Sequence, residues 1–278
     1  MKMKVNRKLS LALFIFLFSM MFMPLKAQAD TMTMELGSGD GWKVEAQVDA
    51  ETYQFQSATA TITSQEGMDA FQSEYSSVKS PYASLLTDMV IGAEITKING
   101  MAADGLKKLT NVSVAADNAA YQSEDNAIYT ADGTELVLCL TGDQTEITVK
   151  DSVTRIGSYA FINNTGLKKV SAGAITTVDF KAFYGCSKLE ELQLESVKRL
   201  GSSAFYGCKS LAKVTITDEA SNCVAQDNVI YSADGKQLIL YPAALSGQVE
   251  LPDTVKIIGG SAFAGNQKLT KVTAGALS

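Results

Sequence analysis

A repeated phrase of 22 residues constrains the fold of this chain more than any other feature. KAFYGCSKLEELQL (181–194) and SAFYGCKSLAKVTI (203–216) are nearly the same sequence, 22 positions apart. The apolar positions of these copies return once more in the preceding segment, 153–172. A fixed period of this length indicates a solenoid, in which each repeat is one structural unit that stacks on the next.

A second, longer repetition overlies the first. Residues 223–276 reproduce residues 121–174 at an offset of 102 positions, and residues 95–114 align in the same way with 197–216. Together the repeats predict five turns, with strands near 109–114, 167–172, 189–194, 211–216 and 269–274.

Two longer segments interrupt these turns, near 117–146 and 219–248. Each contains an Asp-Gly pair between apolar flanks, at Asp132-Gly133 and Asp234-Gly235. Asp-Gly is a frequent two-residue turn between antiparallel strands, so both insertions are predicted to be β-hairpins.

The L-x-x-L-x-L pattern of each copy predicts a short strand with one apolar face. Strands of successive turns would lie about 4.8 Å apart, which brings equivalent apolar residues into continuous ladders. The expected ladders are Leu167–Leu189–Leu211 and Phe161–Phe183–Phe205. The predicted fold is therefore a leucine-rich repeat solenoid, a β-rich α/β architecture of stacked short parallel strands, with the Ala-Phe pairs on turns opposite the strands.

The consensus V-x-x-I-G-x-x-A-F-x-G-C-x-x-L-x-x-V-x-I resembles the BspA-like leucine-rich repeats of bacterial surface proteins. The resemblance covers residues 91–278, and the hairpin DNVIYSADGKQLILYP (227–242) is similar to an insertion that such arrays carry. The chain departs from the pattern at Ala102-Ala103, where Ala-Phe is expected, and at Asn164 and Asn266, where Cys is expected. The resemblance implies an exposed, secreted and adhesive protein.

The region before the array divides into two segments. Residues 1–29 combine a basic start, an apolar run from Leu9 to Met23 and an Ala-Gln-Ala exit, which together indicate a secretory signal peptide. The apolar run of 15 residues is shorter than the 20 or so of a spanning helix, so membrane insertion after signal cleavage is not expected. Residues 30–90 are interpreted as an N-terminal cap for the first turn, with a separate small β-rich domain as the alternative.

Within that segment, TMTMEL (31–36) and YQFQSATATIT (53–63) alternate like strands, and GMDAFQSEYSSVK (67–79) fits a helix. The end of the chain matches a point where the earlier copy continues into another turn. We therefore expect either a fragment of a longer array or a last turn covered by another molecule.

Charge and composition exclude several functions. Without the five basic residues of the signal peptide, 19 basic face 30 acidic side chains, a formal charge of −11. This charge repels nucleic acid and anionic lipid. The chain has no His, which removes the usual general base and zinc ligand, so we expect no enzyme, no cofactor and no metal. The recurring Asp residues of the insertions lack a D-x-D-x-D run, which disfavours calcium.

The four cysteines are at 139, 186, 208 and 223. Cys186 and Cys208 occupy equivalent positions on adjacent turns, within reach of a disulfide. Side chains of a ladder run parallel, however, so two small buried thiols are the favoured interpretation. A link between Cys139 and Cys223 stays open as an alternative.

The outward positions of the strands are the candidate binding residues, because solenoids bind ligands on extended strand faces. Their ladder is expected to run Asn111, Lys169, Glu191, Lys213, Lys271, with polar neighbours on the adjacent positions. The predicted partner-binding residues are Lys169, Ser171, Glu191, Gln193, Glu195, Lys213, Thr215 and Lys271.

The expected function is non-catalytic binding of a protein ligand, an extracellular-matrix or surface protein, at the bacterial cell surface or after secretion. A structural spacer or stalk that presents another module is the alternative. Tyr129 and Tyr231 in the insertions are rival anchors, with packing of each hairpin onto the solenoid as their simpler role.

Overall fold

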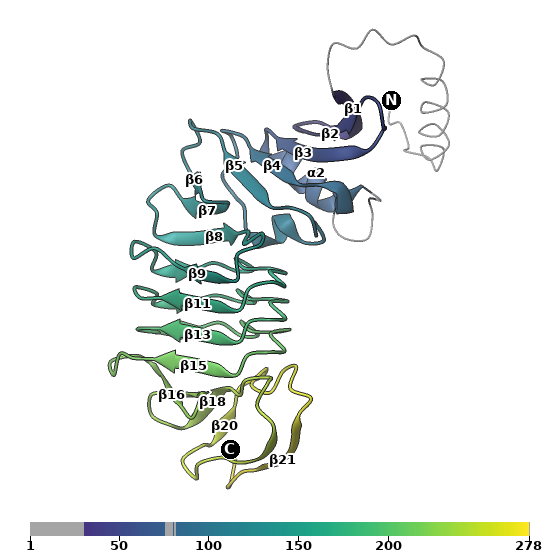
Figure 1. The fold of residues 1–278 in the computed structure, drawn as a ribbon. Helices are drawn as coiled ribbons and strands as arrows, with labels where there is room; N and C mark the ends of the chain where they lie inside the picture. The colour runs from purple at the N-terminus through teal and green to yellow at the C-terminus, as the bar shows by residue number, and fades with distance from the viewer. Residues whose placement is uncertain (1–30, 76–79, 81, 278) are drawn as a thin grey trace.

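A computed structural model describes residues 31–75, 80 and 82–277 of the chain. The predicted signal peptide, 1–29, lies outside the described residues. Figure 1 shows an elongated molecule in which an N-terminal sheet, a stack of short strands and a smaller C-terminal unit follow one another along one axis.

A ladder of four parallel strands runs through the middle of the molecule (Figure 1). Its members are β9 (Glu146–Thr148), β11 (Lys169–Ala172), β13 (Glu191–Leu194) and β15 (Lys213–Ile216). The period of 22 sets the register, because Val170 pairs with Leu192 and Leu192 with Val214. Strands β11, β13 and β15 begin two residues later than predicted, since the first leucine of each pattern, such as Leu189, lies in the preceding turn.

A second parallel ladder, which the sequence did not predict, forms another side of each turn. It contains β8 (Glu135–Cys139), β10 (Arg155–Ile156), β12 (Thr177–Val178) and β14 (Arg199–Leu200). The Ala-Phe pairs lie in turns on a third side, as expected. The Phe161 N–H donates to the Ala182 carbonyl at 2.8 Å, and the Phe183 N–H donates to Ala204 at 2.8 Å.

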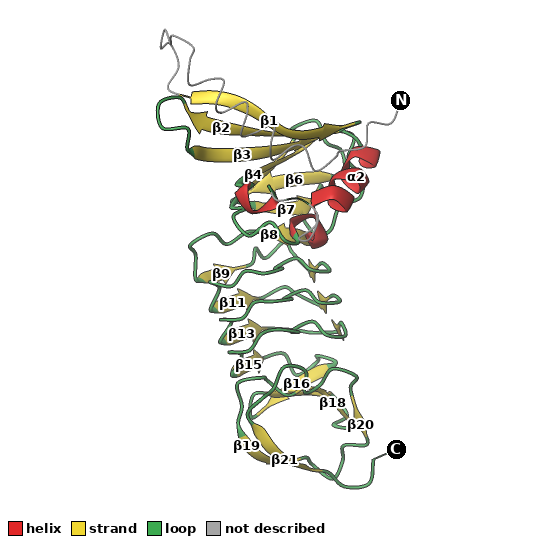
Figure 2. Cartoon of the chain, turned by 90° about the vertical axis from the view of Figure 1, so that its right-hand side faces the viewer, coloured by secondary structure: helices red, strands yellow, loops and turns green. Residues whose placement is uncertain are grey.

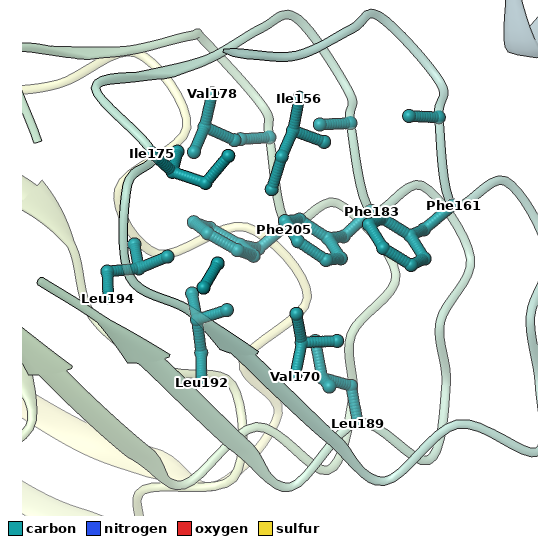
Figure 3. Close-up of a cluster of buried hydrophobic side chains, with 14 of the residues drawn as sticks. Ile156, Phe161, Val170, Ile175, Val178, Phe183, Leu189, Leu192, Leu194 and Phe205 are labelled. Carbon is teal, nitrogen blue, oxygen red and sulfur yellow. The ribbon is translucent and has the colours of Figure 1, made fainter. Parts of the chain in front are cut away.

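The phenylalanine ladder occupies the core of the middle turns, as predicted (Figure 3). The rings of Phe161 and Phe183 stack with centroids 4.8 Å apart, and those of Phe183 and Phe205 with centroids 5.3 Å apart. Phe161 and Phe183 are 0% exposed. Burial of each ring contributes about 1.5–3 kcal/mol to stability.

The solenoid has about eight turns instead of the five that were predicted. Three further strands complete the stack: β4 (Asp88–Ile91), β9 and β19 (Gly247–Glu250). They join β5 (Asn111–Val114), β11, β13, β15 and β21 (Leu269–Thr273). The sequence prediction missed β9 and β19 because they begin within the last residues assigned to the insertions.

Each insertion forms three antiparallel strands. The first has β6 (Tyr121–Glu124), β7 (Ala127–Thr130) and β8, and the second has β16 (Cys223–Gln226), β17 (Val229–Ser232) and β18 (Gln237–Leu240). The Asp-Gly turns lie between the last two strands, as predicted. The other turn is Asp125-Asn126, with φ of 50° and 59°, which fits a type I′ hairpin. The last strand of each insertion pairs in parallel with the next turn, β8 with β10 and β18 with β20 (Ile257–Ile258).

The N-terminal segment continues into the array through a shared sheet. Strands β1 (Thr31–Gly39), β2 (Trp42–Asp49) and β3 (Phe55–Ile62) are antiparallel, whereas β3, β4 and β5 are parallel. The helix α2 (Gln65–Tyr75) lies beside this sheet (Figure 2), and its Phe71 ring meets Trp42 edge-on with centroids 6.0 Å apart. Short 3₁₀ turns follow at Ala83–Leu85 and Gly100–Ala103. Strands β1 and β3 and the helix were therefore expected, whereas β2 was not. The role of this segment as an N-terminal cap stays a prediction.

All four cysteines are free, buried thiols. The Cys186 thiol donates to the Phe161 carbonyl at 2.9 Å, and the Cys208 thiol donates to Phe183 at 3.2 Å. Asn164 replaces Cys in the turn that follows the first insertion. Its amide donates to the Cys139 carbonyl at 2.8 Å and accepts from the Thr141 N–H at 3.0 Å, so Asn connects the turn to the insertion.

Candidate binding face

The strand face is defined here as the outward side chains of β11, β13 and β15, together with the residue after β13, Glu195. Side chains alternate along a strand, so the inward positions, such as Leu192, are buried and their neighbours point to solvent. The strand face holds seven of the eight predicted residues: Lys169, Ser171, Glu191, Gln193, Glu195, Lys213 and Thr215.

Glu191 is the centre of a polar network on this face. Its Oε1 lies 2.9 Å from Lys213 Nζ and 3.7 Å from Lys169 Nζ, one rung on either side. The Gln193 amide also donates to the Glu191 carboxylate, and the Ser171 hydroxyl donates to Gln193 Oε1 at 3.1 Å. The hydrogen bond from Lys213 is the largest influence that lowers the pKa of Glu191. The charges of the face are thus largely compensated within it.

The other end of the strand face is a shallow hollow. A depression of about 500 Å³ opens between Ser171, Gly173, Gln193, Glu195, Thr215 and Thr217. The Glu195 carboxylate lies against Gly173, which has no side chain to fill the space. A hollow this shallow suits contact with a broad macromolecular surface better than enclosure of a small ligand.

The predicted order of the outward ladder is wrong at both ends. Lys169 pairs with Glu146 of β9 instead of Asn111, because β9 supplies a rung that the sequence prediction omitted. Lys271 lies on a separate two-stranded sheet, where β21 pairs with β19 and Lys271 with Gln248. Lys271 is therefore not part of the strand face.

The second parallel ladder carries a charged cluster that sequence reasoning missed. Asp179 is 5% exposed and accepts hydrogen bonds from Arg155 Nε, at 2.6 Å, and from Arg199. The bond to Asp179 raises the pKa of Arg155. The sequence pattern that could have predicted this cluster is a pair of arginines, Arg155 and Arg199, that are two repeats apart with Asp179 between them.

Aromatic side chains gather on the turns that carry the Ala-Phe pairs, also unpredicted. We define the aromatic patch as Tyr159, Phe180, Tyr184 and Tyr206 around Lys181. The Lys181 ammonium lies 5.0 Å from the ring centroid of Tyr184 and 5.1 Å from that of Phe180. The sequence position that could have predicted this patch is the residue after each Ala-Phe pair. In successive copies this residue is Ile162, Tyr184, Tyr206 and Ala264.

The tyrosines of the insertions are packed against the solenoid. Tyr231 is 6% exposed within the C-terminal core, and Tyr129 packs against the middle core below Lys150. Burial is the main cause that raises the pKa of Tyr129 to about 12. The simpler structural role predicted for these residues is confirmed.

In the described part of the chain, no group of three or more His, Cys, Asp or Glu side chains is arranged to hold a metal ion. None of the helices in this part has the length and apolar character needed to cross a membrane.

Comparison with known families identifies the turns. The BspA type leucine-rich repeat region matches six copies, over residues 139–232 and 243–276. These six matched copies are BspA-type leucine-rich repeats, and they cover just under half of the chain. The BspA-type match begins at Cys139, so the turns before the first insertion, including the Ala102-Ala103 departure, lie outside it. Among curated proteins, none matches this chain.

Two solved structures of leucine-rich repeat proteins are similar to the chain. A leucine-rich repeat protein from Eubacterium ventriosum has a TM-score of 0.51 and 21% identity. A leucine rich cell surface protein from Faecalibacterium prausnitzii has a TM-score of 0.51 and 23% identity. Each similarity covers 68% of this chain and 48% of the other, so it spans about half the length of those proteins and establishes the fold alone.

Proposed function

We propose that this chain is a non-catalytic protein-binding module, secreted or held at the bacterial cell surface, that adheres to host or neighbouring-cell proteins. The observation that carries this proposal is the continuous polar strand face of β11, β13 and β15. It presents donors and acceptors at regular spacing on a backbone fixed by parallel pairing on both sides. Extended faces of this kind are where solenoids bind macromolecules.

The family supports a surface role. BspA-type repeats make up the array, and the similar Faecalibacterium prausnitzii protein is described as a cell surface protein. The predicted signal peptide would export the chain to the same place. The formal charge of −11 after its removal favours a partner with basic surface over nucleic acid.

A structural spacer is the second candidate. It is favoured by the internal pairing of the face, in which Glu191 already contacts two lysines and a glutamine. Exposed, self-compensated ion pairs contribute little to binding. A spacer would use the solenoid only for its length, and its face would tolerate substitution.

A binding assay on immobilised collagen, laminin and fibronectin separates the two candidates. The purified chain is compared with a variant that combines Glu191→Ala, Gln193→Ala, Glu195→Ala and Lys213→Ala. Adhesion through the strand face predicts saturable binding that falls at least about 10-fold in the variant. Circular dichroism checks that the variant is folded. Absence of binding by the unaltered chain would favour the spacer, and unchanged binding by the variant would place the contact elsewhere.

A further inference from the structure

We propose that the aromatic patch, with the cleft beside Tyr206, is a docking site for a protein segment that carries an aromatic side chain next to a carboxylate. The proposal rests on the proposed role in protein binding, but it assigns that role to a different side of the solenoid. The strand face and the aromatic patch lie on different edges of the same turns.

Two rings of the patch are exposed, and the other two, Tyr159 and Tyr184, are half-buried. Phe180 is 43% exposed and Tyr206 is 48% exposed, while the phenylalanines one position before each tyrosine are buried. Tyr184 and Tyr206 stack at 5.7 Å between centroids with an interplanar angle of 6°. Tyr159 meets Phe180 and Tyr184 edge-on, at 5.8 and 5.9 Å. Preformed groups of exposed aromatic side chains are typical of protein interaction sites.

Lys181 gives the patch an unneutralised positive charge. Its ammonium lies between 5.0 and 5.9 Å from all four ring centroids. Among the described residues it forms no ion pair, since the nearby Asp179 carboxylate is occupied by Arg155 and Arg199. Cation–π contacts hold the ammonium in place but leave its charge available to a carboxylate.

A cleft continues the aromatic stack on the side of Tyr206 that faces away from Tyr184. It measures about 160 Å³ and is bordered by Tyr206, Leu200, Ser261 and Ala264. The two turns that form it are adjacent, because the Ser203 and Ser261 hydroxyls are 2.8 Å apart. Ala264 occupies the repeat position of Tyr184 and Tyr206, so the stack of rings ends there and one face of Tyr206 borders open space.

The chemistry of this site favours an acidic and aromatic peptide. A cleft of this size accommodates one aromatic side chain, which would extend the Tyr184–Tyr206 stack by a third ring. Around it, tyrosine hydroxyls, the positive edges of the rings and the Lys181 ammonium all favour an anion. A site that binds a glycan by stacking needs several open ring faces. Here Tyr206 covers one face of Tyr184, and the Tyr159 ring also packs against Tyr184, so the patch does not suit a glycan.

The test titrates a fluorescein-labelled peptide with two Asp-Trp-Asp units into the purified chain and follows fluorescence polarisation. Matched peptides replace Asp by Asn or Trp by Ala. The Asp-Trp-Asp peptide should bind, and each matched peptide should bind at least about 10-fold more weakly, because it lacks the carboxylate or the ring. A panel of neutral and sulfated oligosaccharides serves as the glycan probe.

Three variants and one control locate the site. Lys181→Gln removes the charge, Tyr206→Ala reproduces the residue already present at Ala264, and Ala264→Tyr fills the cleft with the array's own side chain. Each should weaken peptide binding at least about 10-fold. Lys43→Gln makes the same charge change on β2, outside both the strand face and the aromatic patch, and should leave peptide binding unchanged. Ala264→Tyr should also retain or raise the unfolding temperature, so its loss of binding would not come from misfolding.

Several results would overturn the proposal. They are an absence of peptide binding up to about 1 mM, equal binding of the Asn peptide, unchanged binding by the three variants, or binding of an oligosaccharide in preference to the peptide. The matrix-protein assay with the strand-face variant is independent of these results. Failure of peptide binding with intact matrix binding would reject the patch alone, and failure of both would reject protein binding as a whole.

Discussion

The middle turns and the last turn of the solenoid contain the same residue types but bury them differently. Ile156 and Val170 are 0% exposed, whereas their counterparts 102 positions later, Ile258 and Val272, are 36% and 41% exposed. Phe161 is fully buried, and its counterpart Phe263 is only partly buried. The sequence pattern is shared, so the difference comes from the neighbouring turns and not from the pattern itself.

This contrast shows that a repeat acquires its stability from the turns on both sides of it. A middle turn packs against a turn above and a turn below, whereas the described part of the last turn packs on one side. Stability of a solenoid is then close to a sum of intrinsic and nearest-neighbour terms. Substitutions at equivalent positions test this directly, because the chemistry is constant and only the neighbours differ.

The largest difference is expected at the phenylalanines. Phe183→Ala should lower the free energy of unfolding by about 3–5 kcal/mol, because its ring packs between Phe161 and Phe205. Phe263→Ala should cost about 1–2 kcal/mol, since among the described residues only Tyr241 is in ring contact with it. Urea denaturation of both variants beside the unaltered chain measures the two losses. Equal losses would contradict the nearest-neighbour explanation.

The asparagines that replace cysteine are expected to show the next largest contrast. Asn164→Cys would leave the buried Thr141 N–H without its acceptor and would replace the amide donor to the Cys139 carbonyl by a weaker thiol donor, at a cost of about 1–3 kcal/mol. Asn266→Cys removes hydrogen bonds to Pro242 and Leu245 in a partly exposed site, so water compensates and the cost should be nearer 1 kcal/mol. Thermal unfolding by circular dichroism compares the two. A stabilising effect of Asn164→Cys would refute the connecting role of Asn164.

The charged cluster of Asp179, Arg155 and Arg199 gives a third comparison between the middle turns, which contain it, and the last turn, which does not. In the copy 102 positions later, the residue that corresponds to Arg155 is Ile257, which is uncharged. Asp179→Ala should destabilise by about 1 kcal/mol, since both arginines remain partly in water. A double-mutant cycle with Arg199→Ala should show non-additive losses. Additive losses would mean that the pair contributes no stability.

The smallest expected effect is a pH dependence of the strand face. The folded state lowers the pKa of Glu191, so its ion pairs stabilise the protein above the ordinary carboxyl value of 4.5 and are lost as the pH falls through the lowered value. Between pH 7 and pH 3 the unaltered chain should lose about 0.5 kcal/mol more than Glu191→Gln, because the pairs are exposed. The copy of this ladder in the last turn has Gln248 opposite Lys271 and should add no such dependence. Parallel pH profiles of both proteins would disprove the contribution.

Much of the fold could be predicted because the core repeats with the chain. The positions Phe161, Phe183 and Phe205 recur every 22 residues, and any arrangement that buries one of them buries the others in line. The same argument placed the strands that begin at Lys169, Glu191 and Lys213. Where the repeat is unbroken, the sequence therefore predicts the register as well as the strands.

The rest depended on where the repeat breaks. The rung β9 follows an insertion, and without it the sequence alignment placed Asn111 beside Lys169 in place of Glu146. The aromatic patch was not predicted for a different reason: its residues lie on turns, and the strand pattern predicts exposure only at the outward strand positions. Tyr184 and Tyr206 do recur with the period of 22, but the cleft beside Tyr206 is lined in part by Gln237 and Ile239 of the second insertion, which the repeat does not place.

The backbone hydrogen bonds between turns run along the long axis of the molecule, parallel to the line that joins its two ends (Figure 1). A tensile force applied end to end would therefore load the few bonds of a single rung before those of the next. The turns would therefore separate one after another. A sheet pulled along its strands, in contrast, resists with all of its hydrogen bonds at once. Each released turn of 22 residues would add about 70 Å of extensible chain, so the molecule would lengthen in steps of one turn under load.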